Sequence, residues 1–169
     1  MKKLVTFVAA AFMLMGTCAF AEGYFSAEDQ ESITITEDLE LEDGFVLHAT
    51  AEKYMNFSKK PVHKTESGEE FNKALQLQGS GKLNVRSVSF PAKAGETITI
   101  YGNSTSKTDV RAIVVCGPDG KPFAELPMDI DGQAGTIASE GKVVAPADGT
   151  YTIYSKKSGI NVYYIGVGN

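Results

Sequence analysis

The stretch of sequence that decides the fold is residues 91–101, PAKAGETITIY, a pattern typical of a tight turn followed by a β-strand. A shorter copy follows at residues 146–154, PADGTYTIY. Proline ends the preceding strand because it has no N–H to donate, and glycine supplies the backbone angles of the turn. Apolar and polar side chains then alternate, so we expect isoleucines to face a core while Tyr101 and Tyr154 face outward.

Strand patterns of this kind recur along the last two thirds of the chain, separated by clusters of Gly, Pro, Asn and Asp. No stretch keeps a period of 3.6 over the roughly 11 residues that a helix needs. The pattern predicts an all-β protein, an antiparallel β-sandwich of jelly-roll type. Residues 58–70 show neither periodicity, and we expect a long loop there. We expect strands at residues 71–77, 82–90, 96–101, 110–116, 136–138, 142–145, 150–155 and 160–167.

The amino terminus has the three parts of a secretory signal peptide. Lys2 and Lys3 precede an uncharged stretch that ends at Ala21 in a small-residue cleavage site. A membrane anchor is the alternative, since the uncharged stretch is long enough to span a bilayer. We expect a cleaved signal peptide at 1–21, an acidic segment with short strands at 22–43 and a β-sandwich domain at 44–169. The predicted location is outside the cytoplasm, secreted or periplasmic, with no membrane attachment after cleavage.

Composition narrows the range of functions. The chain has 169 residues, of which 43% are hydrophobic and 22% charged, and this is the composition of one ordinary folded domain. The net charge is −5 before the two lysines of the signal are removed, which excludes nucleic-acid binding by bulk charge. After cleavage Cys116 is the single cysteine, so no internal disulfide can form. Its apolar neighbours predict a buried thiol.

Catalysis needs groups that converge, and the sequence offers few. It contains two histidines and lacks a nucleophile elbow, a zinc-binding helix or a phosphate-binding glycine loop. His48 alternates with apolar neighbours and is interpreted as a strand histidine, while His63 lies in the expected loop. A pair of carboxylates could be drawn from many acids, which makes a small hydrolase a weak third hypothesis. We therefore predict that the protein is not an enzyme.

Residues 129–140 resemble the two ends of a calcium-binding loop, with Asp129, Asp131 and Glu140 at suitable positions. The middle of the loop does not fit, because Ala134 stands where such loops have glycine. We predict no cofactor and leave open a structural calcium ion.

Binding is the function that the remaining residues favour. Flat tyrosine rings can stack on the apolar faces of sugars, and basic side chains can meet the carboxylates of acidic sugars. Cross-strand packing and solubility are the alternative roles for the same residues. The predicted ligand-binding residues are Arg86, Tyr101, Lys107, Arg111, Tyr154 and Lys156.

One family resemblance covers residues 45–167. The segments that carry it are ALQLQGSG at 74–81, RSVSF at 86–90, ITIYGNS at 98–104, DVRA at 109–112 and YSKKSGINVYYI at 154–165. Together they resemble the accessory β-sandwich modules of bacterial pectate lyases and related pectin-degrading enzymes, and the last segment is the most specific.

The resemblance implies a non-catalytic role in binding carbohydrate, with an acidic galacturonan as the ligand. Arg86 and Arg111 match the recurring arginines of those modules. The chain is too short to hold both the sandwich and the parallel β-helix that performs lyase chemistry. Our hypothesis is a secreted carbohydrate-binding module for plant or other acidic polysaccharides such as pectin. The alternative is a surface structural or adhesion subunit whose sheet edges meet other proteins.

Overall fold

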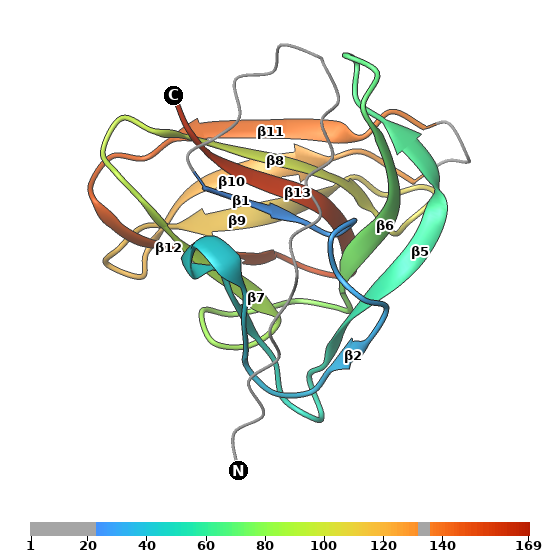
Figure 1. The fold of residues 1–169 in the computed structure, drawn as a ribbon, viewed down its shortest axis with the longest axis horizontal. Coiled ribbons are helices and arrows are strands. Elements are labelled where there is room, and N and C mark those ends of the chain that lie inside the picture. Colours follow the sequence, from blue (N-terminus) through green and yellow to red (C-terminus); the bar gives the residue numbers. More distant parts are fainter. Residues whose placement is uncertain (1–22, 132–135) are drawn as a thin grey trace.

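The structure is a computed structural model that describes residues 23–131 and 136–169. The predicted signal peptide, residues 1–21, lies outside the described residues. Two antiparallel β-sheets pack face to face around the main hydrophobic core, which confirms the predicted β-sandwich (Figure 1). Among the described residues no helix is long and apolar enough to cross a membrane.

Sheet A has the strand order β11-β8-β13-β6-β5-β2, and β1 pairs with β13 beside it. Its strands are β11 (Ser139–Val144), β8 (Thr97–Ser104), β13 (Ile160–Gly168), β6 (Glu70–Leu77), β5 (Met55–Lys64), β2 (Thr34–Ile35) and β1 (Gly23–Ser26).

Sheet B has the strand order β10-β9-β12-β7-β4-β3. Its strands are β10 (Pro122–Met128), β9 (Arg111–Cys116), β12 (Gly149–Ser155), β7 (Ser87–Ala92), β4 (Val46–His48) and β3 (Leu39–Glu40), and a short 3₁₀ turn η1 (Glu42–Gly44) precedes β4. The acidic segment therefore contributes strands to both sheets.

The core forms where the inner faces of the two sheets meet. Ile98 and Ile100 of β8 and Ile153 of β12 are completely buried in it, as their alternation predicts. The residues between them point the other way. Tyr101 and Tyr154 are accordingly both partly exposed, the first on the outer face of sheet A and the second on the outer face of sheet B.

Two strands lie where the sequence did not predict them. The expected loop at 58–70 is wrong, because β5 continues to Lys64 and pairs with β6 in a hairpin. Pro61 lies within β5 where the pairing register shifts between Lys59 and His63, and such an irregularity accommodates a residue without an N–H. β10 contains two prolines but forms the edge of sheet B, where a missing donor costs least.

Two expected strands differ in extent. Residues 136–138 form only an isolated bridge between Ile137 and Lys64, not a strand. The strand expected from residue 82 begins at Ser87, because Arg86 has a positive φ of 49° that breaks the extended backbone.

Candidate functional site

Three tyrosine rings form a continuous surface on the outer face of sheet A. Tyr164 of β13 pairs with Tyr101 of β8, and their ring centroids lie 6.2 Å apart. Tyr24 of β1 stacks on Tyr164 at 6.0 Å with an interplanar angle of 17°. Tyr24 is 44% exposed, and the other two rings are partly exposed. We call these three residues the tyrosine surface.

The sequence builds this surface with a bulge and a glycine. The register of β13 against β8 shifts between Val162 and Tyr164, so Tyr163 and Tyr164 both lie on the outer side of sheet A while Ile165 returns to the core. Gly166 follows, and a Cβ atom there would lie 2.7 Å from Cε1 of Tyr164. Only glycine leaves room for the Tyr164 ring to lie across the strand.

Polar groups border the tyrosine surface on the β11 side. The Tyr101 hydroxyl donates a hydrogen bond to Oε1 of Glu140 at 2.5 Å, and Lys142 Nζ lies 2.8 Å from the same oxygen. Burial raises the pKa of Glu140, but the hydrogen bonds from Lys142 and Tyr101 outweigh it and leave that pKa below its ordinary value. The border therefore offers a carboxylate acceptor and an ammonium donor.

The opposite border is acidic. Burial raises the pKa of the Tyr24 hydroxyl, and the negative charges of Asp29, Asp43 and Glu42 raise it further. The backbone N–H of Tyr24 also donates to Oδ2 of Asp43 at 3.3 Å. Hydroxyl groups fit this border, whereas a negatively charged ligand would be repelled.

A second, small core supports the tyrosine surface from beside it. It contains Phe71, Ala74, Ala138 and Tyr163, with Tyr101 packed against it. The rings of Phe71 and Tyr163 stack at 5.4 Å with an interplanar angle of 8°. This cluster lies outside the main core, and its four members are nevertheless buried.

A buried polar cluster joins β5, Asp131 and β13. His63 is completely buried, with Nε2 2.8 Å from Asp131 Oδ1 and Nδ1 2.6 Å from the Pro61 carbonyl oxygen. Both partners offer oxygen acceptors to the ring nitrogens. Asn161 Nδ2 donates to Oδ2 of the same carboxylate at 3.3 Å. The sequence did not predict this cluster, because its members come from three distant segments.

The calcium pattern noted in the sequence is split by the fold. Asp131 faces His63, whereas Glu140 accepts from Tyr101 on the outer face of sheet A. In the parts of the chain that the structure describes, no group of three or more His, Cys, Asp or Glu side chains could hold a metal ion.

The structure divides the predicted ligand-binding residues between two places. Tyr101 lies in the tyrosine surface, and Tyr154 lies on the outer face of the other sheet, so the two rings cannot contact one ligand ring. Tyr154 is instead near Cys116, with its hydroxyl 3.9 Å from Sγ. The remaining predicted residues come from the end of the sandwich where β7 and β9 begin and β12 ends. We call these residues the basic end: Arg86, Lys107, Arg111 and Lys156.

Both arginines of the basic end brace loops. Arg111 Nη1 donates to Thr105 Oγ1 at 2.7 Å and to the Gly159 carbonyl oxygen at 2.6 Å. Arg86 Nε donates to the Tyr54 carbonyl oxygen at 3.3 Å. Arg111 thus links the β8–β9 loop to the β12–β13 loop, and Arg86 separately links the β6–β7 loop to the β4–β5 loop.

The two lysines of the basic end differ in their contacts. Lys156 Nζ pairs with Glu125 at 2.7 Å, with both side chains about half exposed. Lys107 is exposed in the loop between β8 and β9. Lys107 is therefore the more accessible charge for an acidic ligand.

His48 forms a chain of contacts on the outer face of sheet B. Its Nε2 lies 2.8 Å from Ser89 Oγ and its Nδ1 lies 3.0 Å from Asp38 Oδ2. Ser89 lies in the regular part of β7, which pairs with β12 and β4, so the backbone groups around it serve the sheet rather than a reacting oxyanion. Asp38 Oδ1 also accepts from the Ala49 N–H at 3.2 Å. The network ties the acidic segment to sheet B.

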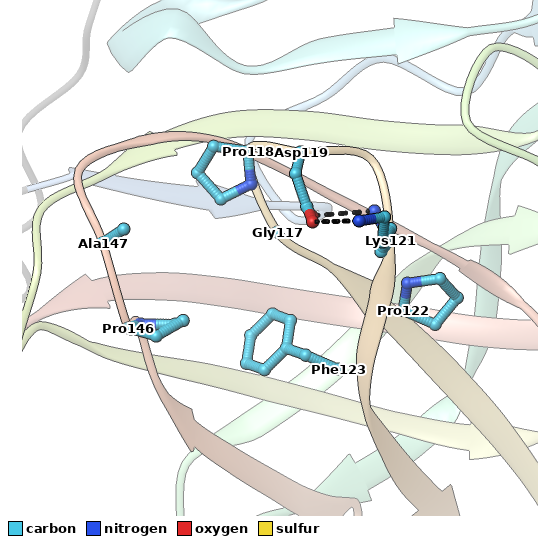
Figure 2. A pocket seen from close by; sticks show the side chains of 8 residues that line it. All are labelled: Gly117, Pro118, Asp119, Lys121, Pro122, Phe123, Pro146 and Ala147. Carbon is cyan, nitrogen blue, oxygen red and sulfur yellow. Dashed lines mark hydrogen bonds and ion pairs between the residues drawn. The ribbon is translucent and has the colours of Figure 1, made fainter.

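A pocket of about 480 Å³ lies among the loops at the other end of the sandwich (Figure 2). It is formed by the turn between β9 and β10 and by the segment between β11 and β12. Phe123, Pro146 and Ala147 form part of its lining, and Asp119 and Lys121 face them across the opening. Sequence reasoning did not identify it, because proline-rich turns have no pattern that distinguishes a pocket from an ordinary connection.

The fold and these surfaces define a β-sandwich protein with an aromatic outer face and a pocket at one end. No protein-family model matches its sequence, and no curated protein is significantly similar to it.

Several solved structures that resemble it are carbohydrate-binding modules. One is the C-terminal CBM6 of the laminarinase LamC from Zobellia galactanivorans, with 16% identity over 82% of this chain and 100% of that chain and a TM-score of 0.37. Another is CsCBM6-3 from Clostridium stercorarium in complex with cellobiose, with 10% identity over 92% and 99% and a TM-score of 0.39. The CBM51-2 and INT domains of Clostridium perfringens ZmpB share 9% identity over 88% of this chain and 32% of that chain, with a TM-score of 0.46.

Proposed function

We propose that this protein is a non-catalytic carbohydrate-binding β-sandwich, secreted after removal of its signal peptide, and that it holds polysaccharide on the tyrosine surface. The observation that carries the proposal is the stack of Tyr24 on Tyr164 beside Tyr101, exposed on a sheet face and bordered by Glu140 and Lys142.

The chemistry of this surface suits a sugar chain. One face of a pyranose ring presents C–H groups, which pack on aromatic rings, while its hydroxyls need acceptors and donors at the edge. The carboxylate of Glu140 can accept from such a hydroxyl, and Lys142 can donate to one. The rings are held in place by the sheet and by Phe71, so little conformational entropy is lost on binding.

An acidic polysaccharide such as pectin is the finer form of the proposal, and it rests on the basic end. Lys107 and Lys156 would meet uronate carboxylates there, while the arginines hold the loops that carry them. This contact is electrostatic and exposed, so salt screens it. The tyrosine surface has acidic neighbours and does not contribute to that charge preference.

Affinity electrophoresis through gels containing polysaccharide tests the proposal. Tyr24→Ala should raise the Kd for a neutral polysaccharide about tenfold and so reduce its retardation, since an aromatic contact contributes roughly 0.5–1.5 kcal/mol beyond burial. Tyr54→Ala is the matched control, because Tyr54 is a similarly exposed tyrosine, 40%, outside the tyrosine surface. Equal retardation of the two variants would remove the tyrosine surface from the account.

A further inference from the structure

We infer that the pocket at the end of the sandwich is a second saccharide site, which takes one or two rings of a neutral sugar chain. The site lies where β9 ends, whereas the basic end lies where β9 begins, so the two are at opposite ends of the molecule. The inference shares its class of ligand with the proposed function, and it uses a different surface.

The pocket is built on a rigid frame. Tyr151 is completely buried, and its hydroxyl donates to the Ala147 carbonyl oxygen at 2.6 Å and accepts from the Ala147 N–H at 3.2 Å. This pair of bonds fixes the segment that carries Pro146 and Ala147. Phe123 packs edge-on against Tyr151, with ring centroids 5.8 Å apart at 71°.

The facing turn is equally fixed. The Gly117 N–H donates to the Lys121 carbonyl oxygen at 3.0 Å, and the Gly120 N–H donates to the Gly117 carbonyl oxygen at 2.9 Å. Pro118 lies so close to Gly149 that a Cβ atom there would be 2.6 Å from the proline ring. Because both sides of the pocket are held in place before a ligand arrives, little conformational entropy is lost on binding.

The two sides of the pocket differ in chemistry, as Figure 2 shows. The Phe123 ring, 39% exposed, lies between Pro146 and Pro122 and offers an apolar face. Asp119 lies across from it, with Oδ1 accepting from the Lys121 N–H at 3.0 Å and Oδ2 3.4 Å from Lys121 Nζ. That backbone hydrogen bond lowers the pKa of Asp119, so the carboxylate stays charged at neutral pH.

A saccharide ring matches this arrangement of groups. It has an apolar face for Phe123 and the prolines, and hydroxyls that can donate to the free lone pairs of the Asp119 carboxylate. A uronate fits less well, because its own carboxylate would face Asp119 and the Lys121 ammonium is already paired. The volume of about 480 Å³ lies in the range of small-molecule pockets, roughly 300–1,000 Å³.

Nitrogen-15 NMR titration of the protein with cellobiose, xylobiose, lactose and digalacturonate tests the inference. We expect the amides of Gly117, Lys121, Phe123 and Ala147 to shift with at least one of the three neutral disaccharides at concentrations up to about 10 mM, and less with digalacturonate. If none of the neutral disaccharides moves these amides, the inference is overturned.

Two variants test whether the disaccharide binds in the pocket. Phe123→Ala removes the aromatic face and should weaken binding at the pocket about tenfold. Gly117→Ala is gentler, because its new Cβ would make ordinary contacts of 3.7 Å with Phe123 Cδ1 and 3.6 Å with Asp119 Oδ1, and it should narrow the pocket without unfolding the protein. If Gly117→Ala binds the neutral disaccharide as the unaltered protein does, the sugar is not in the pocket.

Tyr24→Ala separates this inference from the proposed function, since it should leave the shifts at Gly117 and Phe123 unchanged. Shifts confined to Tyr24, Tyr101 and Tyr164 would overturn the pocket and support the tyrosine surface. Shifts confined to the pocket would support the inference and contradict the tyrosine surface.

Discussion

At the scale of single residues, Gly166 leaves the room in which the Tyr164 ring stacks on Tyr24. A side chain at this position would meet the Tyr164 ring at 2.7 Å from Cε1 and 2.9 Å from the hydroxyl oxygen. A shift of the Tyr164 ring away from such a side chain would disturb its stack on Tyr24. The absence of a side chain at position 166 therefore allows the Tyr164 ring to keep its place in the tyrosine surface.

Gly166→Ala should accordingly weaken polysaccharide retention as strongly as Tyr24→Ala, at a cost of about 1–3 kcal/mol in the free energy of unfolding. Gly23→Ala is the control, because its Cβ would make an ordinary 3.6 Å contact with Cβ of Asp43. Affinity electrophoresis and urea denaturation measure the two effects. Full retention by Gly166→Ala would mean that the Tyr164 ring does not need its present position.

Arg111 was predicted from the sequence as a contact to ligand, and the structure places its guanidinium on Gly159 and Thr105. Arg111→Ala should lower the free energy of unfolding by about 1–2 kcal/mol, because it removes charge-assisted hydrogen bonds. Lys107→Ala should leave stability unchanged and reduce retention on polygalacturonate instead. Urea denaturation and gel retention measure both effects. A stability loss in Lys107→Ala together with a retention loss in a stable Arg111→Ala would contradict these two roles.

Glu140 makes the stability of the fold depend on pH. Its folded-state pKa lies below the ordinary value of 4.5, so the ionised carboxylate stabilises the fold. This contribution is present in full above pH 4.5 and is lost as the pH falls through the lower folded-state pKa. The melting temperature of Glu140→Gln should therefore lie below that of the unaltered protein at pH 7, and the gap should narrow toward pH 3. A gap that is constant with pH would show that ionisation plays no part.

At the scale of elements, Asp131, which follows β10, is tied to β5 by the buried His63. Asp131→Ala would leave Nε2 of a completely buried ring without an acceptor, at a cost of about 1–3 kcal/mol in the free energy of unfolding. Asp131→Asn keeps an acceptor oxygen and should cost less. Urea denaturation distinguishes the two, and an Asp131→Ala variant as stable as the unaltered protein would contradict the role of this contact.

The strands that the sequence predicts are those with strict alternation against the core. Ile98 and Ile100 in β8 and Ile153 in β12 carry that pattern, and their inward orientation is confirmed. β5 and β10 could not be found in this way, because the lysines and Pro61 of the first and the prolines of the second obscure the alternation. Both depend on pairing with distant strands, β6 and β9, which local sequence does not reveal.

The candidate site was only partly predictable for the same reason. The outward position of Tyr101 follows from alternation within one strand. Its neighbours Tyr24 and Tyr164 lie 77 and 63 positions away in the sequence. They come next to it only because β1 pairs with β13 and β13 pairs with β8. The bulge that turns Tyr164 outward has no signal in the sequence itself.

At the scale of the whole molecule, three surfaces are kept apart: the tyrosine surface on sheet A, the basic end and the pocket at the opposite end. Binding to uronate chains through the basic end should weaken steeply as salt rises, whereas contacts to the tyrosine surface should change little. Retention on polygalacturonate and on a neutral polysaccharide at two salt concentrations compares them. Equal salt dependence for the two polymers would contradict the division of roles.

The most direct test of the central claim is to detect which protons of the protein lie against a bound sugar. Intermolecular nuclear Overhauser effects should connect the ring protons of Tyr24 and Tyr164 with the C–H protons of an oligosaccharide taken from the best-retained polysaccharide. If the bound sugar shows such effects to other residues and to none of the three tyrosines of the surface, the sugar-binding role of the outer face of sheet A is wrong.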